Sequence, residues 1–137
     1  MKLSEDPLYV DAMTCLFKGD YAQARDKLRI CSESTQDDVW KAFFRRVIAE
    51  SFRQEHRLSD AMSEINKAVK IDPSPLSLVK KAEFACLFLK DFSVGSAAFV
   101  AALQKGKVYA DPTFDELRFR RQTLRRMQEL GIDTSDY

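Results

Sequence analysis

The sequence predicts an all-α protein, and three observations carry that prediction. Apolar residues make up 45% and charged residues 31% of its 137 residues, the balance of an ordinary folded domain. Apolar side chains recur every three or four positions, which is the period of an amphipathic helix. Only four glycines and four prolines are present, too few for many short strands joined by turns. We therefore expect one helical domain spanning residues 1–137.

The first four helices are bounded by aspartates, a glycine and polar breaks. Asp6 can accept hydrogen bonds from the free amides of a first turn, and Gly19 can end the helix that follows. Asp20 would begin the second helix, and the polar stretch 32–36 reads as the loop after it. A proline-rich break at 72–75 closes the fourth. The four helices are expected at about 7–18, 21–31, 37–54 and 58–70.

The last three helices follow from similar signals. Pro75 suits the first turn of the fifth helix, and Asp91 can cap the sixth, which should end at Gly106. Thr113 and Glu116 have the spacing of a capping box at the start of the seventh. These helices are expected at about 75–89, 92–106 and 113–130, with a frayed tail at 131–137.

The helices also repeat in pairs. Three blocks share one pattern: a small residue, a large apolar residue four positions later, and a small residue three positions after that. The blocks are Ala24, Leu28 and Cys31; Ala61, Ile65 and Ala68; and Gly95, Phe99 and Ala102. They lie 37 and then 34 residues apart. The small residues would let paired helices approach closely, while the large ones would fill the space between pairs.

This pattern resembles the tetratricopeptide repeat (TPR), a helix–turn–helix unit of 34 residues. The resemblance implies three repeats, at about 5–38, 42–75 and 76–109, in a right-handed superhelix of antiparallel helix pairs. It departs from the family at Asp11, where leucine is preferred, and at Glu83, where a small residue is preferred. A plain helical bundle whose apolar positions match by chance is the alternative.

The seventh helix, at about 113–130, would cap the last repeat. Its apolar residues lie close to one stripe, which can cover an exposed repeat face. The stripe comprises Phe114, Leu117, Leu124, Met127 and Leu130. Five arginines lie on the rest of the helix, and Arg118, Arg121 and Arg125 form a candidate basic patch for an acidic peptide or RNA. The alternative is a solvated outer face.

Composition and motifs disfavour catalysis. His56 is the only histidine and falls at an expected turn, and the chain has neither a GxGxxG motif nor a P-loop. The three cysteines include no CxxC pair, so we expect no metal and no cofactor. A formal charge of +1 does not point to nucleic acid. Without a long apolar run, no membrane segment is expected, and free cysteines suit the cytoplasm.

The resemblance implies a binding groove along the first helices of the three repeats. By position, its residues would be Tyr9, Met13, Leu16, Arg46, Glu50, Arg53, Lys80, Phe84 and Leu87. Such a wall would be apolar at both ends and mostly basic in the middle. It suits a peptide or helix of another protein, amphipathic and carrying acidic groups. The alternative is that Tyr9, Met13 and Phe84 only pack within the stack.

Two functions fit a chain of this kind. The first is an adaptor or assembly subunit, a non-enzymatic protein-interaction module that binds a segment of another protein. The second is a dedicated small TPR chaperone that shields a hydrophobic helix of a partner, such as a secretion-system subunit. Neither requires a small-molecule substrate. Glu50 argues against the carboxylate clamp of heat-shock co-chaperones, because it would repel a terminal carboxylate.

Overall fold

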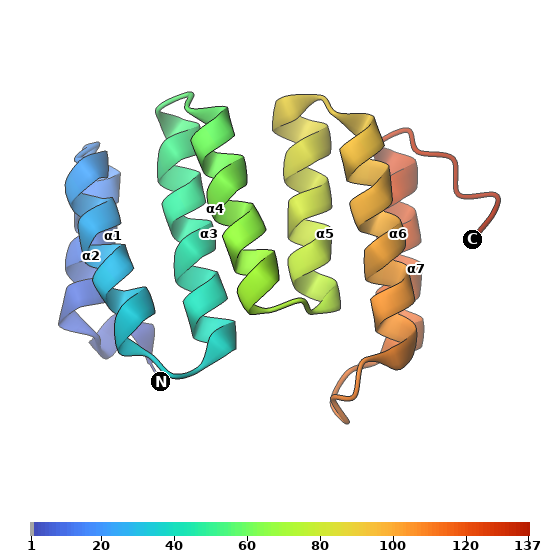
Figure 1. The fold of residues 1–137 in the computed structure, drawn as a ribbon, viewed down its shortest axis with the longest axis horizontal. Helices are drawn as coiled ribbons and strands as arrows, with labels where there is room; N and C mark the ends of the chain where they lie inside the picture. Colours follow the sequence, from blue (N-terminus) through green and yellow to red (C-terminus); the bar gives the residue numbers. More distant parts are fainter. Residues whose placement is uncertain (1) are drawn as a thin grey trace. The chain divides into compact units, whose positions relative to one another are not determined.

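Residues 2–137, which the computed structural model describes, contain seven α-helices and no β-strand (Figure 1). The all-α prediction is confirmed. The helices are α1 (Pro7–Lys18), α2 (Tyr21–Ser34), α3 (Asp38–Gln54), α4 (Leu58–Ile71), α5 (Pro75–Phe84), α6 (Phe92–Val108) and α7 (Glu116–Glu129). A 3-10 turn, η1 (Leu3–Glu5), precedes α1, and a π-helical turn, η2 (Ala85–Leu89), extends α5.

The chain divides into two compact units. The first, Met1–Asp72, carries α1 to α4, and the second, Pro73–Tyr137, carries α5 to α7. The boundary falls close to the expected border between the second and third repeats. The expectation of a single domain stays a prediction.

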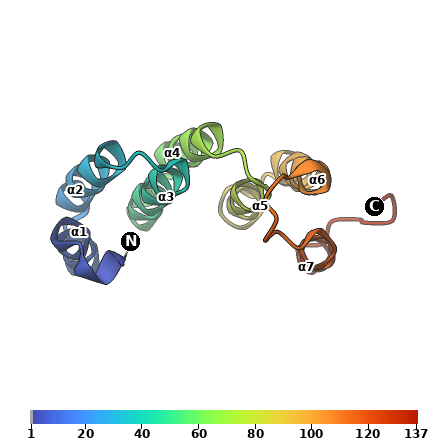
Figure 2. The ribbon, with the colours of Figure 1, turned by 90° about the horizontal axis from the view of Figure 1, so that it is seen from below.

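In the first unit each helix packs against the next, α1 on α2, α2 on α3 and α3 on α4, as the end-on view shows (Figure 2). Small residues stand at the contacts, and the repeat positions Ala24, Ala61 and Ala68 are all buried, as predicted. Phe44 and Ile48 fill the space between them. The alanines therefore set how closely the helices approach.

Buried charged groups also join the helices of the first unit. Arg25 on α2 donates to the Ser51 hydroxyl on α3 at 3.1 Å and pairs with Glu55. Its guanidinium lies 4.2 Å from the centre of the Phe52 ring. A second pair, Arg45 Nη1 to the buried Glu64 Oε2 at 3.3 Å, links α3 to α4, with Arg45 partly exposed. Each buried charge thus has a partner, which burial requires.

The second unit is built on apolar contacts. α5 and α6 form an antiparallel pair with a close contact at Gly95, where an added Cβ would lie 2.2 Å from the Cys86 Sγ and 3.3 Å from the Ala82 carbonyl oxygen. α7 covers this pair and buries Met127 completely against Phe99 and its neighbours. The pair of Arg126 Nε with Glu83 Oε2, at 3.1 Å, ties α7 to α5. α7 therefore packs on the second unit, and its role as the cap of a repeat stays a prediction.

Two expected helix boundaries differ from the structure. α2 continues to Ser34 rather than ending near Cys31; Ser32 is buried and donates to the Lys41 carbonyl at 3.4 Å. α5 does not run as an α-helix to Leu89. It widens into η2 after Phe84 and closes with the Asp91 amide bonded to the Ala85 carbonyl at 2.9 Å.

The glycine expected to end α6 has another role. α6 continues through Gly106 to Val108, and Gly106 is buried where an added Cβ would lie 3.2 Å from the Phe119 ring. The capping box at Thr113 is also wrong, because Asp115 caps α7 by accepting from the Arg118 amide at 3.0 Å. Glycine can mark a close contact as well as a helix end.

The stripe on α7 and the tail also differ from expectation. Leu117 is 69% exposed, and the half-buried Phe119 takes its place in the packing. Ile132 packs on the core of the second unit, and Gln128 donates to the Thr134 hydroxyl at 2.9 Å. The tail is therefore held by contacts rather than frayed.

Candidate functional site

The three predicted groove residues of α1 pack toward α3. Leu16 is buried beside Cys15 and Ala24, and the half-buried Met13 lies in the same cluster. The Tyr9 ring centre lies 6.2 Å from that of Phe43. Leu16, predicted as a groove residue, is therefore packed inside the unit, while Tyr9 and Met13 are half-buried.

An aromatic cluster at this end of the first unit escaped sequence reasoning. Trp40 and Phe43 pack edge to face at 5.5 Å, and both surround the buried Phe44 together with Tyr9. Trp40, Phe43 and Tyr9 are half-buried, so the cluster continues to the surface. The signal was the i, i+3, i+4 spacing of Trp40, Phe43 and Phe44, which places them on one side of a helix.

The most exposed large apolar side chain on α1 was also missed. Phe17 is 85% exposed and Val10 is 42% exposed. The spacing of Val10, Met13 and Phe17, i, i+3 and i+7, places them along one stripe of the helix. An isolated exposed apolar residue needs no explanation, but a stripe of them next to a surface aromatic cluster favours contact with another molecule.

The central part of the predicted groove carries less positive charge than expected. On α3 the Glu50 carboxylate accepts two hydrogen bonds from Arg53, one of them from Nε at 2.8 Å. Gln54 donates a third at 3.3 Å. The Arg53 hydrogen bonds hold the pKa of Glu50 below its usual value, although burial opposes them. The charge of Arg53 is thus balanced within α3.

Arg46 supplies the remaining positive charge of this part. Its side chain is half-buried on α3. Burial lowers the pKa of Arg46, while the Asp72 carboxylate raises it. Since arginine stays protonated in proteins, Arg46 remains a cation.

In the second unit, the predicted residues lie on α5 and η2. Lys80 is exposed, Phe84 is buried and Leu87 is 37% exposed. Phe88, which was not predicted, is 39% exposed, with its ring 5.2 Å from that of Phe84. The π turn carries Leu87 and Phe88 at the end of the helix.

The exposed rings of the two units hold equivalent places in the predicted repeat pattern. Phe17 follows Leu16 at the end of α1, and Phe88 follows Leu87 at the end of η2. The offset between Phe17 and Phe88 equals that between the repeat residues Ala24 and Gly95. Each unit therefore presents an exposed phenylalanine at the end of its first helix.

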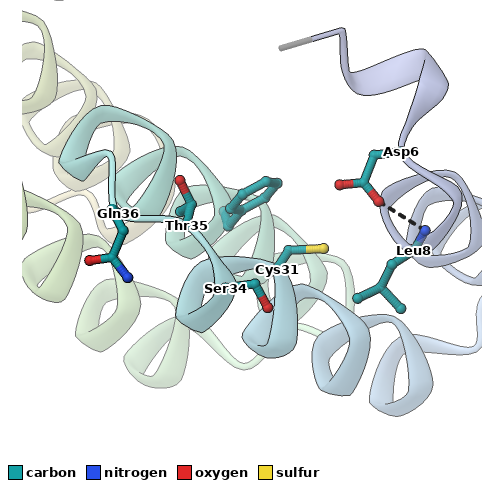
Figure 3. A pocket seen from close by; sticks show the side chains of 7 residues that line it. Asp6, Leu8, Cys31, Ser34, Thr35 and Gln36 are labelled. Carbon is teal, nitrogen blue, oxygen red and sulfur yellow. Dashed lines mark hydrogen bonds between the residues drawn. The ribbon is translucent and has the colours of Figure 1, made fainter.

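A hollow of about 450 Å³ lies between the start of α1 and the end of α2 (Figure 3). Its lining comprises Asp6, Leu8, Cys31, Ser34, Thr35, Gln36 and Phe44. The Asp6 carboxylate accepts from the Leu8 amide at 3.0 Å and so caps α1. Burial, and then the charge of Asp6, raises the pKa of the Cys31 thiol, which stays protonated. We assign these groups to helix capping and packing.

The arginines of α7 separate into two groups. Arg126 bonds Glu83 and Glu129, and Arg120 donates to the Tyr137 carbonyl. The three residues of the predicted basic patch, Arg118, Arg121 and Arg125, are all exposed. The patch is thus a distinct surface of the second unit.

Other expected features are placed as follows. His56 is an exposed turn residue with a left-handed φ of 60°. Among residues 2–137, the cysteines are all free and buried, and no group of three or more histidine, cysteine or acidic side chains could hold a metal ion. Over the same range, none of the helices is both long and apolar enough to cross a membrane. No protein-family model, curated protein or solved structure matches the chain.

Proposed function

We propose that this chain is a TPR-type protein-interaction module that binds a segment of another protein and catalyses no reaction. The repeat reading is supported by the buried small residues at the helix contacts, among them Ala24, Ala61 and Gly95. The binding reading rests on one observation. Phe17 and Phe88, at equivalent repeat positions, leave aromatic surface exposed at the end of the first helix of each unit.

The exposed rings favour an apolar anchor on the partner. Fully burying a phenylalanine side chain stabilises a complex by roughly 1.5–3 kcal/mol. A contact at Phe17 alone would therefore supply a large part of the binding free energy of a weak complex. On α1 the Val10–Met13–Phe17 stripe extends this surface, and on η2 Leu87 does. A partner helix with anchors three or four positions apart fits such stripes.

The charges of the predicted groove bear on what else the partner carries. Lys80 on α5 is an exposed cation of that groove. On α3, Glu50 balances the charge of Arg53, and Asp72 interacts electrostatically with Arg46. We therefore propose an amphipathic partner segment that carries few acidic residues, rather than a strongly acidic one.

The test is affinity capture from the native source with matched variants. Phe17→Ser and Phe88→Ser should each reduce recovery of the partner, chiefly through faster dissociation, because they remove apolar burial. Ile30→Ser on α2 is the control, since Ile30 is 51% exposed but lies on the second helix of its pair. Equal recovery with Phe17→Ser, Phe88→Ser and wild type would refute the proposed faces.

The same exposed apolar residues favour a second candidate, a dedicated chaperone for a hydrophobic helix. The adaptor and chaperone proposals predict different behaviour of the protein without its partner. A chaperone without its client should self-associate through Phe17 and Phe88, whereas an adaptor should stay monomeric in sedimentation at micromolar concentration. The buried free cysteines suit either role in the reducing cytoplasm.

A further inference from the structure

The basic patch on α7 differs from every other arginine site in the chain. Arg118, Arg121 and Arg125 are exposed and stand at i, i+3 and i+7, so they form one stripe along α7. Within residues 2–137, no carboxylate lies at ion-pair distance from any of the three. The stripe is therefore an uncompensated line of three guanidinium groups.

The other eight arginines each have a hydrogen-bonded or electrostatic partner. They are Arg25, Arg29, Arg45, Arg46, Arg53, Arg57, Arg120 and Arg126. The sequence is nearly neutral, with 22 basic and 21 acidic residues, so carboxylates are available elsewhere. The contrast sets the three α7 arginines apart from the ordinary solvated surface.

Three acidic residues lie closest along α7, namely Asp115, Glu116 and Glu129, and Glu116 forms no ion pair with the stripe. Asp115 accepts a hydrogen bond from the Arg118 backbone amide at 3.0 Å and caps the helix. Glu129 binds Arg126 at 3.2 Å, on the side that also holds Glu83. None of the three compensates the stripe. Its positive charge is available to an external anion.

An apolar residue adjoins the stripe. Leu117 is 69% exposed and stands four positions before Arg121, so the two side chains are neighbours on the helix surface. A basic line with an apolar contact at one end matches an amphipathic acidic helix better than a free anion. Guanidinium groups bind carboxylates through paired hydrogen bonds, which gives such a contact geometric selectivity.

We propose that this face of α7 docks an acidic helical segment of a partner protein, with carboxylates one turn apart facing Arg118, Arg121 and Arg125 and an apolar side chain on Leu117. Its residues lie on α7, whereas Phe17 lies on α1 and Phe88 on η2. A protein ligand is favoured over RNA because Phe114 and Phe119, whose ring centres lie 5.3 Å apart with the rings tilted, are half-buried rather than spread over the basic face for base stacking.

The test uses the full chain and a synthetic helical peptide with glutamates at i, i+3 and i+7 and one leucine a turn away. Titration at low salt should give saturable binding. Replacing Arg118, Arg121 and Arg125 together with glutamine should weaken it about tenfold, and added salt should shrink the difference. The control removes the same number of positive charges by changing three exposed lysines to glutamine, namely Lys2, Lys70 and Lys107. Its affinity for the peptide should differ from wild type by less than about twofold.

Three further arms make the test decisive. A peptide of the same composition with scrambled glutamate positions should bind more weakly than the designed one, and the three-lysine variant of the stripe should lie between wild type and the glutamine variant. Phe17→Ser should leave peptide binding unchanged, which separates this surface from the proposed function. Equal loss in the lysine control, or equal binding of the scrambled peptide, would overturn the proposal. Tighter binding of an oligouridine than of the peptide would assign the stripe to nucleic acid.

Discussion

Different kinds of contact hold the helices together within each of the two units. In the first, buried charged groups cross between helices, with Arg25 bound to Ser51 and Glu55 and Arg45 bound to Glu64. In the second, helices meet through apolar side chains and two buried glycines, Gly95 and Gly106, that permit close approach. Only the partly exposed Arg126–Glu83 pair joins two α-helices there.

The difference predicts opposite weaknesses. A buried ion pair is costly when one partner is removed, because the other charge stays buried. Adding a Cβ at a glycine contact lowers stability, because the new atom overlaps the facing backbone and side chain, which are too tightly packed to move. The first unit should therefore be most sensitive to losing a charge, and the second to gaining a methyl group.

The largest effect is expected at Glu64. Glu64→Leu removes the carboxylate that serves Arg45 and, at 3.2 Å, Lys67. Leaving Arg45 largely buried without a counter-ion should lower the free energy of unfolding by about 3 kcal/mol, measured by urea denaturation. Asp26→Leu is the control, because the Asp26 carboxylate is exposed. A Glu64→Leu protein as stable as wild type would show that this pair does not hold α3 on α4.

Ala61→Leu should come next. Ala61 is completely buried on α4, at the small position of the repeat pattern. The larger side chain should destabilise by roughly 1–3 kcal/mol through overpacking, seen as a lower Tm. If this variant melts at the wild-type temperature, the repeat register is wrong.

Gly95→Ala should cost about 1–2 kcal/mol in the second unit. The new Cβ would lie 2.2 Å from the Cys86 Sγ and 3.3 Å from the Ala82 carbonyl oxygen, and this overlap outweighs the higher helix propensity of alanine. Adding Cys86→Ala removes the closer atom. The double variant should recover part of the loss in a double-mutant cycle, whereas additive losses would place the strain elsewhere.

The smallest effect is the pH dependence of the Glu50–Arg53 pair. Because the pKa of Glu50 is lowered by the Arg53 hydrogen bonds, its contribution is present above the pKa of the unfolded glutamate and is lost as the pH falls through the folded value. At neutral pH, Glu50→Gln should cost about 0.3 kcal/mol, as for other exposed i, i+3 pairs. Below the folded pKa this difference should vanish; a difference that persists there would assign it to packing.

Local signals predicted much of the fold, and close contacts between helices explain most of the errors. Asp6 and Asp91 cap α1 and α6 where the sequence placed them, because capping depends on neighbouring residues alone. Gly106 was wrongly predicted to end α6. Glycine is needed there because the Phe119 ring, 13 positions later in the chain, packs against it. The end of α5 was also mispredicted at a place of tertiary packing, because the change to a π turn accompanies the burial of Ala85 and Cys86 in the core.

The candidate site was predicted only in outline. The repeat register located Tyr9, Met13 and Lys80 on first helices, but sequence alone gives no exposure, so Phe17 and Phe88 were missed. It also counted Arg53 as a positive charge for a partner, although Glu50, three positions earlier, is bonded to it. Side-chain pairing of this kind depends on rotamers that a register does not specify.

The most direct test of the partner-binding account is site-specific photo-crosslinking in cells. A photoreactive phenylalanine analogue placed at 17 or at 88 should capture the partner protein, because both positions are exposed on the proposed faces, while the same group at Ile30 should not. Partner capture at 17 and 88 with little at 30 is the predicted result. Equal capture at all three positions, or capture only from 118 or 121 on α7, would contradict the account.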